Sequence, residues 1–370
     1  MAGATWTHTS LAQQLVFGAG AVARLPDLVK GIGARRVLLV TTPGRLASPD
    51  GERIVGLLGR SLESTFGEVT SHVPVPLVQQ AVHQARRDGI DLVVSFGGGS
   101  CADLGKAVGF FLEQEAGMPG ASHLDRPVVP HLSIPTTYSG AELTPFFGMT
   151  DPGTKQKQGA GGPTSAPVIA VYDPDLTAST PPRVRAETGM NALAHCVEAA
   201  WSPRRTPEAE AVALGGAAAI HAALPATVGH PDDADARAAM LAGAALAGRA
   251  LLNAGMGVHH GLAQLVGGRT GIPHGLANAV LLAHCVRFNA EAVPGDVARI
   301  GAALGRPDDA AGAVDDLRAG LGLPARLSEV GVTEDDLDAV ARQSQSNRSV
   351  AANPRPVAED DARALLQSAF

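Results

Sequence analysis

The pattern of hydrophobic and polar residues differs between the two halves of the chain. In the first half, short apolar runs alternate with amphipathic segments. Residues 35–43 (RRVLLVTTP), 91–96 (DLVVSF) and 131–137 (HLSIPTT) have the unbroken hydrophobicity of buried parallel strands. Residues 77–89, which precede the second run, carry the apolar stripe of a helix. Strands and helices in alternation predict a doubly wound α/β layer.

After about residue 180 the strand patterns stop, and Ala-rich segments with a helical period follow. Pro and Gly separate most of them. The predicted helices are 183–201, 207–222, 233–252, 258–268, 276–289, 296–304, 309–320, 333–342 and 357–369. We therefore predict an α/β dinucleotide-binding domain over 1–165 and an all-helical domain over 166–370. Residues 152–167, near the boundary, have the composition of a loop.

Composition narrows the class of protein. The net charge of −7 provides no basic surface, so nucleic acid and anionic membrane are not expected partners. The apolar segment 211–228 is mostly Ala and Gly and contains a proline, which favours a packed helix over a membrane span. The N-terminus has neither a basic nor an apolar leader region. Three cysteines lie in apolar patterns, as expected in a reducing compartment: Cys101, Cys196 and Cys285. We expect a cytoplasmic protein that acts on a small molecule.

A glycine turn joins a predicted strand to a helix at residues 97–107 (GGGSCADLGKA). Without Cβ atoms, Gly98 and Gly99 allow the backbone to approach a pyrophosphate. The free N–H groups near Ser100 would then face the anion. The predicted cofactor site also includes Asp103, one turn into the helix. Because the pattern is not GxGxxG, a tight strand–helix connection without a ligand is the alternative interpretation.

A second polar segment follows the strand at 131–137. Thr136, Thr137 and Ser139 come directly after it, where hydroxyls can bond a nucleotide at the carboxyl edge of a parallel sheet. A capping box between Ser139 and Glu142 is the alternative, and the two interpretations are compatible.

The strand at 37–42 ends in Thr41-Thr42-Pro43 and carries no acid there. An acid would bond a ribose 2′-hydroxyl and repel a 2′-phosphate. Both NADH and NADPH therefore remain candidates, and Thr42 is included in the predicted cofactor site.

The helical half carries a second candidate site. Asn191 and His195 are four residues apart, on one face of a predicted helix. His260 lies on another apolar helix, and His274 follows a Gly-Ile-Pro turn. The four are arranged like a metal site, and the three histidines could hold Zn or Fe. An amide is a much poorer ligand than a carboxylate, so a bound metal is not favoured.

Six segments in order carry a family resemblance. They are LVFGAGAVARLPDLVKGIGARRVLLVTTPG, FGGGSCADLGKA, IPTTYSGAELTPFFGMTD, VYDPDLTASTPP, TGMNALAHCVEA and ANPRPV. Together they resemble the iron-containing alcohol dehydrogenase superfamily, and within it the maleylacetate reductase branch. The resemblance implies a dehydroquinate synthase-like fold, with an N-terminal dinucleotide-binding domain, a helical domain and an active site in the cleft between them. It also implies a homodimer.

The resemblance assigns roles to residues. Metal-holding members use an Asp and three His, which correspond here to Asn191, His195, His260 and His274. The Asn is a feature of the maleylacetate reductase branch, whose members can work without a metal. That branch reduces a carbon–carbon double bond of maleylacetate with NADH or NADPH to give 3-oxoadipate.

The chain also departs from that branch. Gly261 and Gln264 stand where a Lys and a His are typical, and residues 158–161 replace a Thr-Gly-Arg-Asp element. Residues 273–278 (PHGLAN) are closer to the metal-dependent alcohol dehydrogenases. Two carboxylates buried without cationic partners would cost several kcal/mol. The expected substrate is therefore an enone, unsaturated oxo acid or other carbonyl compound, and not maleylacetate.

The predicted chemistry is hydride transfer to the substrate followed by protonation. His274 is the expected acid, His260 and His195 assist it, and Asn191 bonds the carbonyl. An alternative is a scaffold repurposed for cyclisation, elimination or isomerisation in a biosynthetic pathway. A ligand-binding relative without activity is a third possibility.

Overall fold

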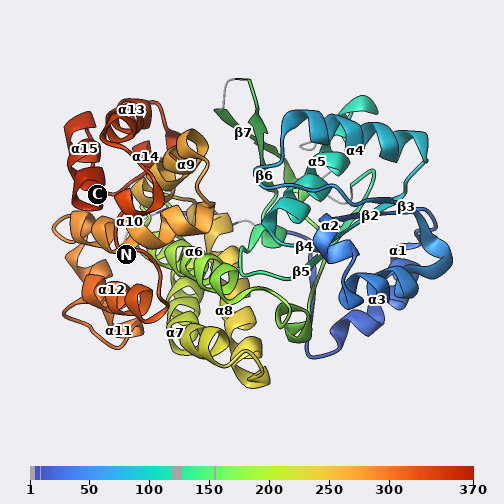
Figure 1. The fold of residues 1–370 in the computed structure, drawn as a ribbon, viewed down its shortest axis with the longest axis horizontal. Coiled ribbons are helices and arrows are strands. Elements are labelled where there is room, and N and C mark those ends of the chain that lie inside the picture. The colour runs from blue at the N-terminus through green and yellow to red at the C-terminus, as the bar shows by residue number, and fades with distance from the viewer. Residues whose placement is uncertain (1–4, 9, 119–126, 154–155) are drawn as a thin grey trace. The chain divides into compact units, whose positions relative to one another are not determined.

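The computed structural model describes residues 5–8, 10–118, 127–153 and 156–370, and it separates into two compact units (Figure 1). The α/β unit is Ser10–Thr180. The helical unit comprises Pro181–Phe370 and residues 5–8, where His8 Nδ1 lies 3.0 Å from Thr206 Oγ1. The boundary thus falls after Thr180, whereas the sequence pattern predicted it after residue 165. The difference arises because the strand that follows residue 165 pairs within the sheet of the first unit.

The α/β unit is built on a parallel sheet of six strands in the order β1-β8-β5-β4-β2-β3, with all pairings parallel. The strands are β1 (Gln14–Phe17), β2 (Val37–Thr41), β3 (Leu62–Phe66), β4 (Leu92–Gly97), β5 (His131–Pro135) and β8 (Ile169–Tyr172). The three predicted strands are β2, β4 and β5, which are fully buried and lie side by side in the sheet. This confirms the predicted parallel α/β class.

Helices cover both faces of this sheet: α1 (Leu25–Ile32), α2 (Pro43–Leu46), α3 (Pro49–Leu58), α4 (Val75–Arg87) and α5 (Gly99–Glu115). Alternate residues of β2 enter opposite cores, as the period of a strand requires. Val37 and Leu39 pack in one core with α1 and α3, whereas Leu38 and Val40 pack in the other with α4 and α5. Unbroken hydrophobicity in the central strands therefore reflects burial on both faces.

A separate antiparallel hairpin, β6 (Phe146–Asp151) with β7 (Gln156–Gly161), follows β5. The loop predicted over 152–167 is therefore wrong for residues 156–161. The segment QKQGAG has none of the β-branched and aromatic residues that mark strands, so its pairing with β6 could not be predicted from composition. Gly161 has a φ of +149°, and a Cβ there would lie 2.2 Å from the Pro145 carbonyl oxygen, which requires glycine.

The second unit is helical in its described residues after Pro181, which confirms the predicted class. Its helices are α6 (Pro182–Trp201), α7 (Pro207–Gly229), α8 (Ala234–Ala254), α9 (Val258–Thr270), α10 (His274–Asn289), α11 (Pro294–Ala303), α12 (Ala310–Gly320), α13 (Glu334–Ser344), α14 (Arg348–Ala351) and α15 (Glu359–Ser368). Each predicted helix is present with ends shifted by one or two residues, except that α7 continues seven residues beyond the predicted end at 222. Helix α7 has the length and mean hydropathy (1.6) of a membrane span, but it packs against α6 and α8 and contains Pro225.

Candidate functional site

The carboxyl ends of β2 and β4 form the topological switch point of the sheet. Chain connections leave these neighbouring strands in opposite directions, from β2 to β3 on one side and from β4 to β5 on the other. The Thr41 hydroxyl at the end of β2 donates to the Phe96 carbonyl of β4 over 2.7 Å. Ligands of open α/β sheets bind in the crevice at such a point.

The predicted glycine turn lies at this edge of the sheet. Gly97 has a φ of +147°, and a Cβ there would lie 2.5 Å from Cys101 Sγ, so the turn needs glycine. Helix α5 then begins at Gly99, and no side chain caps its N-terminus. The N–H groups of a long helix at an uncapped N-terminus attract an anion.

The two predicted cofactor segments lie against each other. A Cβ on Gly98 would lie 3.1 Å from Thr137 Cγ2, and one on Gly99 would lie 3.1 Å from Ser139 Oγ. The Oγ1 atoms of Thr136 and Thr137 are buried without a hydrogen-bond partner in the described part of the chain. The arrangement therefore combines an anion-attracting helix end with hydroxyls that a polar ligand can satisfy.

Two other predicted cofactor residues have protein partners. Thr42 Oγ1 accepts the Arg45 N–H over 3.2 Å and caps α2. Asp103 Oδ1 pairs with Lys106 Nζ at 2.8 Å, and its Oδ2 accepts the Gly148 N–H at 3.2 Å. Asp103 and the fully buried Lys106 thus tie α5 to the hairpin.

The alternative capping box between Ser139 and Glu142 is wrong. Residues Ala141–Leu143 form a short 3-10 helix that starts after Gly140, with no side-chain cap. The Glu142 carboxyl instead accepts the Tyr172 hydroxyl, and burial raises the pKa of Glu142. Because the Glu142 carboxyl is bonded to Tyr172, it does not accept the backbone N–H of Ser139 as a capping box requires.

In the helical unit, one face of α6 carries Asn191, His195 and Glu198, at i, i+4 and i+7. The structure brings the predicted histidines together. The imidazoles of His195 and His260 are stacked, with centroids 4.5 Å apart and planes 14° apart. The His260 and His274 rings are 6.0 Å apart.

Glu198 is a site residue that the sequence analysis missed. Its Oε2 lies 2.6 Å from His260 Nδ1, and both residues are 1% exposed. The same carboxylate accepts the backbone N–H groups of His259 (2.9 Å) and His260 (3.4 Å) at the N-terminus of α9. A negative charge stabilises a helix N-terminus, so Glu198 joins α6 to α9 and orients the histidine at once. Its spacing from Asn191 and His195 was the available signal.

The hydrogen-bond network assigns the protons around His260. Asn278 Nδ2 donates to the His274 carbonyl (2.9 Å) and also to the Asn191 side chain (2.9 Å), so the Asn191 atom that faces it is the carbonyl oxygen. This oxygen lies 3.3 Å from His260 Nε2, which must therefore carry a hydrogen. The network thus gives His260 an N–H that points at Asn191.

The other nitrogen of His260 also carries a proton. Burial lowers the pKa of His259 to about 4, so this ring is neutral. Its Nε2 donates to the Asn278 carbonyl at 2.9 Å, which leaves a lone pair on Nδ1, 3.3 Å from His260 Nδ1. A second lone pair there would be repelled, so His260 Nδ1 donates to Glu198. His260 and Glu198 thus share a proton in a buried pair, and burial raises the pKa of Glu198.

This proton arrangement does not fit a metal ion. The two nitrogens of His260 already contact Glu198 and Asn191, and the neutral amide of Asn191 supplies no anionic ligand to Zn or Fe. Among the described residues, the group whose metal-ligating atoms lie within 4.8 Å of one another is Glu198, His259 and His260, and not the three histidines at family positions. The atoms of that group are already hydrogen-bonded to one another. The residues present therefore form a proton-holding network.

The three predicted histidines differ in exposure. His195 and His260 are buried, whereas His274 at the start of α10 is partly exposed. Burial, reinforced by the charge of His260, holds the pKa of His195 well below its usual value. The Nδ1 of His195 is buried without a hydrogen-bond partner in the described residues. His274 is therefore the imidazole that a ligand can reach most readily.

Two glycines set the packing of the helices around these histidines. A Cβ on Gly275 would lie 2.7 Å from the Glu187 carbonyl oxygen, so glycine brings α10 against α6. A Cβ on Gly261 would lie 2.5 Å from Val350 Cγ2. Val350 fills the space beside Gly261, so a glycine in place of the lysine typical of the branch does not enlarge the site.

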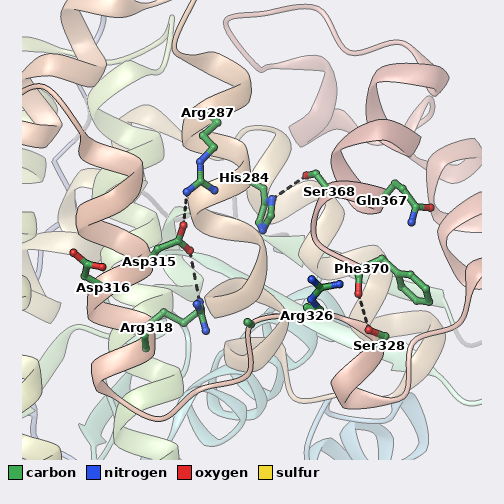
Figure 2. Close-up of a pocket in the computed structure, with 12 residues that line it drawn as sticks. His284, Arg287, Asp315, Asp316, Arg318, Arg326, Ser328, Gln367, Ser368 and Phe370 are labelled. Atoms are coloured by element: carbon green, nitrogen blue, oxygen red, sulfur yellow. Dashed lines mark hydrogen bonds and ion pairs between the residues drawn. The ribbon is translucent and has the colours of Figure 1, made fainter.

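A pocket of about 650 Å³ lies further along α10 (Figure 2). Its basic side chains face acidic ones: Arg287 contacts Asp315, and Arg318 Nε lies 3.7 Å from Asp315. His284 Nδ1, between them and α15, lies 2.8 Å from Ser368 Oγ. Because these charges offset one another and the histidine network lies elsewhere, this pocket is not the candidate site.

Two family models match the two units in turn. A family model described as iron-containing alcohol dehydrogenase matches residues 12–174, and its companion, Fe-containing alcohol dehydrogenase family, C-terminal, matches residues 185–370. The chain belongs to the iron-containing alcohol dehydrogenase family.

Individual relatives place it in one branch of that family. It is 35% identical to maleylacetate reductase of Rhizobium sp. (strain MTP-10005), over 99% of this chain and 97% of that one. It is 36% identical to maleylacetate reductase of Burkholderia cepacia, over 96% and 95% of the two chains. The crystal structure of maleylacetate reductase from Agrobacterium tumefaciens matches with a TM-score of 0.87 at 35% identity, covering 99% and 98%. The maleylacetate reductase branch is therefore confirmed.

Proposed function

We propose that this protein is an NADH- or NADPH-dependent reductase of an enone, an unsaturated oxo acid or a related carbonyl compound that carries less negative charge than maleylacetate. The observation that carries the proposal is the buried Glu198–His260–Asn191 network beside the partly exposed His274. During reduction, negative charge develops on the carbonyl oxygen of the substrate. The network would place a proton and a positive charge near that oxygen.

The nucleotide would bind with its pyrophosphate on Gly98, Gly99 and Ser100 and its nicotinamide end near Thr136 and Thr137. The uncapped N-terminus of α5 and the unpartnered threonine hydroxyls support this placement. When bound, the nicotinamide supplies the hydride. Thr42 lies at the same edge of the sheet, although its hydroxyl already caps α2.

The protein's own residues stabilise the charge that develops on the carbonyl oxygen. The imidazolium of His260 provides electrostatic stabilisation, and Asn191 holds it in place through its Oδ1. His274 is the proposed proton donor, because it is the most accessible of the three histidines. His195, stacked on His260, assists by excluding water from the pair.

Charge at the site separates this substrate from that of the relatives. Gly261 and Gln264 supply no cation, and the Gln264 amide points to Met256 Sδ at 3.7 Å. A dicarboxylate would lose several kcal/mol of binding there.

Steady-state kinetics test the proposal. Oxidation of NADH or NADPH is expected with simple enones such as (E)-4-oxopent-2-enoate. A kcat/KM for maleylacetate within the ordinary range, above roughly 10⁴ M⁻¹s⁻¹, would show that the departures are neutral. Product formation without nucleotide oxidation would instead support the non-redox alternative.

We further propose a homodimer that acts in the cytoplasm. Cys101, Cys196 and Cys285 are buried and free, which is consistent with a reducing compartment. Light scattering coupled to size-exclusion chromatography tests the dimer: a monomeric mass at micromolar concentration would contradict it.

A further inference from the structure

Arg185 is a buried cation that is incompletely hydrogen-bonded within the described part of the chain. It lies in the first turn of α6 and is 2% exposed, yet its Nε and Nη1 have no hydrogen-bond partner among the described residues. The position itself disfavours a cation, because the N-terminal end of a helix carries a partial positive charge. The nearest acid on the helix, Glu187, is already bonded to Arg183 at 2.8 Å.

Such a group is strongly unfavourable unless something neutralises it. A guanidinium stays protonated in proteins, so burial cannot simply remove the charge. Buried charges are normally paired, and the planar guanidinium is suited to bidentate binding of a carboxylate or a phosphate.

Other polar atoms of the helical unit that have no hydrogen-bond partner among the described residues lie on the same helices as the histidine network. They are His195 Nδ1 and Trp201 Nε1 on α6 and Asn278 Oδ1 on α10. Arg185 precedes Asn191 by six residues on α6, which is a rise of about 9 Å along the helix and places the two side chains on faces about 120° apart. That separation is within the reach of an arginine side chain and a small oxo acid together.

We propose that Arg185 binds the carboxylate of the substrate, so that the substrate is an unsaturated oxo acid with a single carboxylate. This inference rests on the proposed function and selects one of its substrate classes. Arg185 would then bind one carboxylate. The Lys and His that are typical of the branch are replaced here by Gly261 and Gln264, so a second carboxylate would have no cation at those positions.

The test is binding of levulinate (4-oxopentanoate), a saturated mono-carboxylate that cannot be reduced at a double bond. Calorimetric titration is done on the protein with NADH bound. Arg185→Met is expected to weaken levulinate binding by about 10- to 100-fold, the scale of a charge-assisted hydrogen bond, and Arg185→Lys should recover part of it. Arg249→Met, which removes the same charge from an exposed position on α8, should change binding less than about 2-fold.

Three results would overturn the inference. The first is levulinate binding that is absent in wild type or unchanged in Arg185→Met. The second is a loss of NADH or NADPH affinity in Arg185→Met, which would assign the anion to a nucleotide phosphate. The third is a lower midpoint of urea unfolding for ligand-free Arg185→Met than for ligand-free Arg249→Met. Such a loss of stability would mean that Arg185 is paired with a group of the protein itself. The two proposals can fail separately. If levulinate binding depends on Arg185 but enones cause no oxidation of NADH or NADPH, the proposed function is wrong and the carboxylate site at Arg185 is still supported.

Discussion

Glu198 Oε2 lies 2.6 Å from His260 Nδ1, and the carboxylate that holds this imidazole also accepts the backbone N–H groups of the first turn of α9. The contact joins two helices that are far apart in the sequence. Glu198 therefore both stabilises the packing of α6 on α9 and holds the imidazole of His260, and different substitutions at this position can separate the two effects.

Glu198→Gln should lower kcat by about 10- to 100-fold with little change in KM for the nucleotide. The amide retains an oxygen for the α9 backbone, but it lacks the charge that stabilises the His260 imidazolium. Glu198→Ala should also destabilise the fold by about 3–5 kcal/mol, because it removes the buried carboxylate that pairs with His260 and accepts the first N–H groups of α9. Steady-state kinetics and urea unfolding measure the two effects. Equal kcat in Glu198→Gln and wild type would exclude the proposed role of the pair.

Protein purified without added metal should contain far less than one Fe or Zn per chain and should keep its activity in a chelator. The reason is that Asn191 supplies no negative charge and that Glu198 and Asn191 already contact the two nitrogens of His260. Asn191→Asp, which adds an anionic ligand, is the comparison expected to retain more metal. Elemental analysis checks both proteins. One tightly held metal per wild-type chain, with activity lost on chelation, would contradict the assignment of these protons.

Gly99→Asp should raise the Kd for NADH and NADPH by at least about 10-fold, because it puts a carboxylate at the N-terminus of α5, where the pyrophosphate is proposed to bind. Any side chain at this position is tight, since its Cβ would lie 3.1 Å from Ser139 Oγ. Gly99→Asn therefore serves as the control of equal size without charge. Fluorescence titration that gives the two variants the same Kd would place the phosphates elsewhere.

Acidification should destabilise the α/β unit through His131. Burial, together with the charge of Lys106, lowers the pKa of this imidazole to about 3, whereas the unfolded chain takes up a proton near the ordinary value of 6.5. The folded-state pKa is the lower one, so stability is present above pH 6.5 and is lost as the pH falls toward 3. At pH 5 the loss is about 2 kcal/mol.

His131→Gln should remove most of that loss and keep a side chain able to bond Ser95, whose Oγ lies 2.7 Å from His131 Nε2. Urea unfolding at pH 7.5 and pH 5 measures the difference. His83→Gln, an exposed position on α4, is the control. A pH dependence in His131→Gln equal to that of wild type would rule out His131 as its source.

Gly261→Ala should destabilise the protein by about 1–3 kcal/mol, because the added methyl group meets Val350 Cγ2 at 2.5 Å. Val350→Ala should restore much of this in the double variant, and a double-mutant cycle on unfolding free energies gives the coupling. Additive effects would show that the two positions do not touch. A lysine at position 261 is expected to improve dicarboxylate binding only together with Val350→Ala.

The site was only partly predictable from the sequence. The helix period placed Asn191 and His195 on one face of α6, since local spacing fixes which residues share a face, and the family resemblance added His260 and His274. The same period placed Glu198 on that face, but a glutamate on a helix is usually solvated, and its contact with α9 depends on tertiary packing. The hairpin strand β7 was missed for a similar reason: its pairing with β6 stabilises a sequence that has little strand preference of its own.

The capping of α9 by Glu198 also governs how this region moves. Amides in the first turn of a helix usually exchange quickly with solvent, because no helical carbonyl accepts them. The amides of His259 and His260 are instead bonded to a buried carboxylate on α6, 61 and 62 residues earlier in the chain. Their hydrogen exchange requires α6 and α9 to separate, so two amides at a helix end report the opening of the whole histidine network.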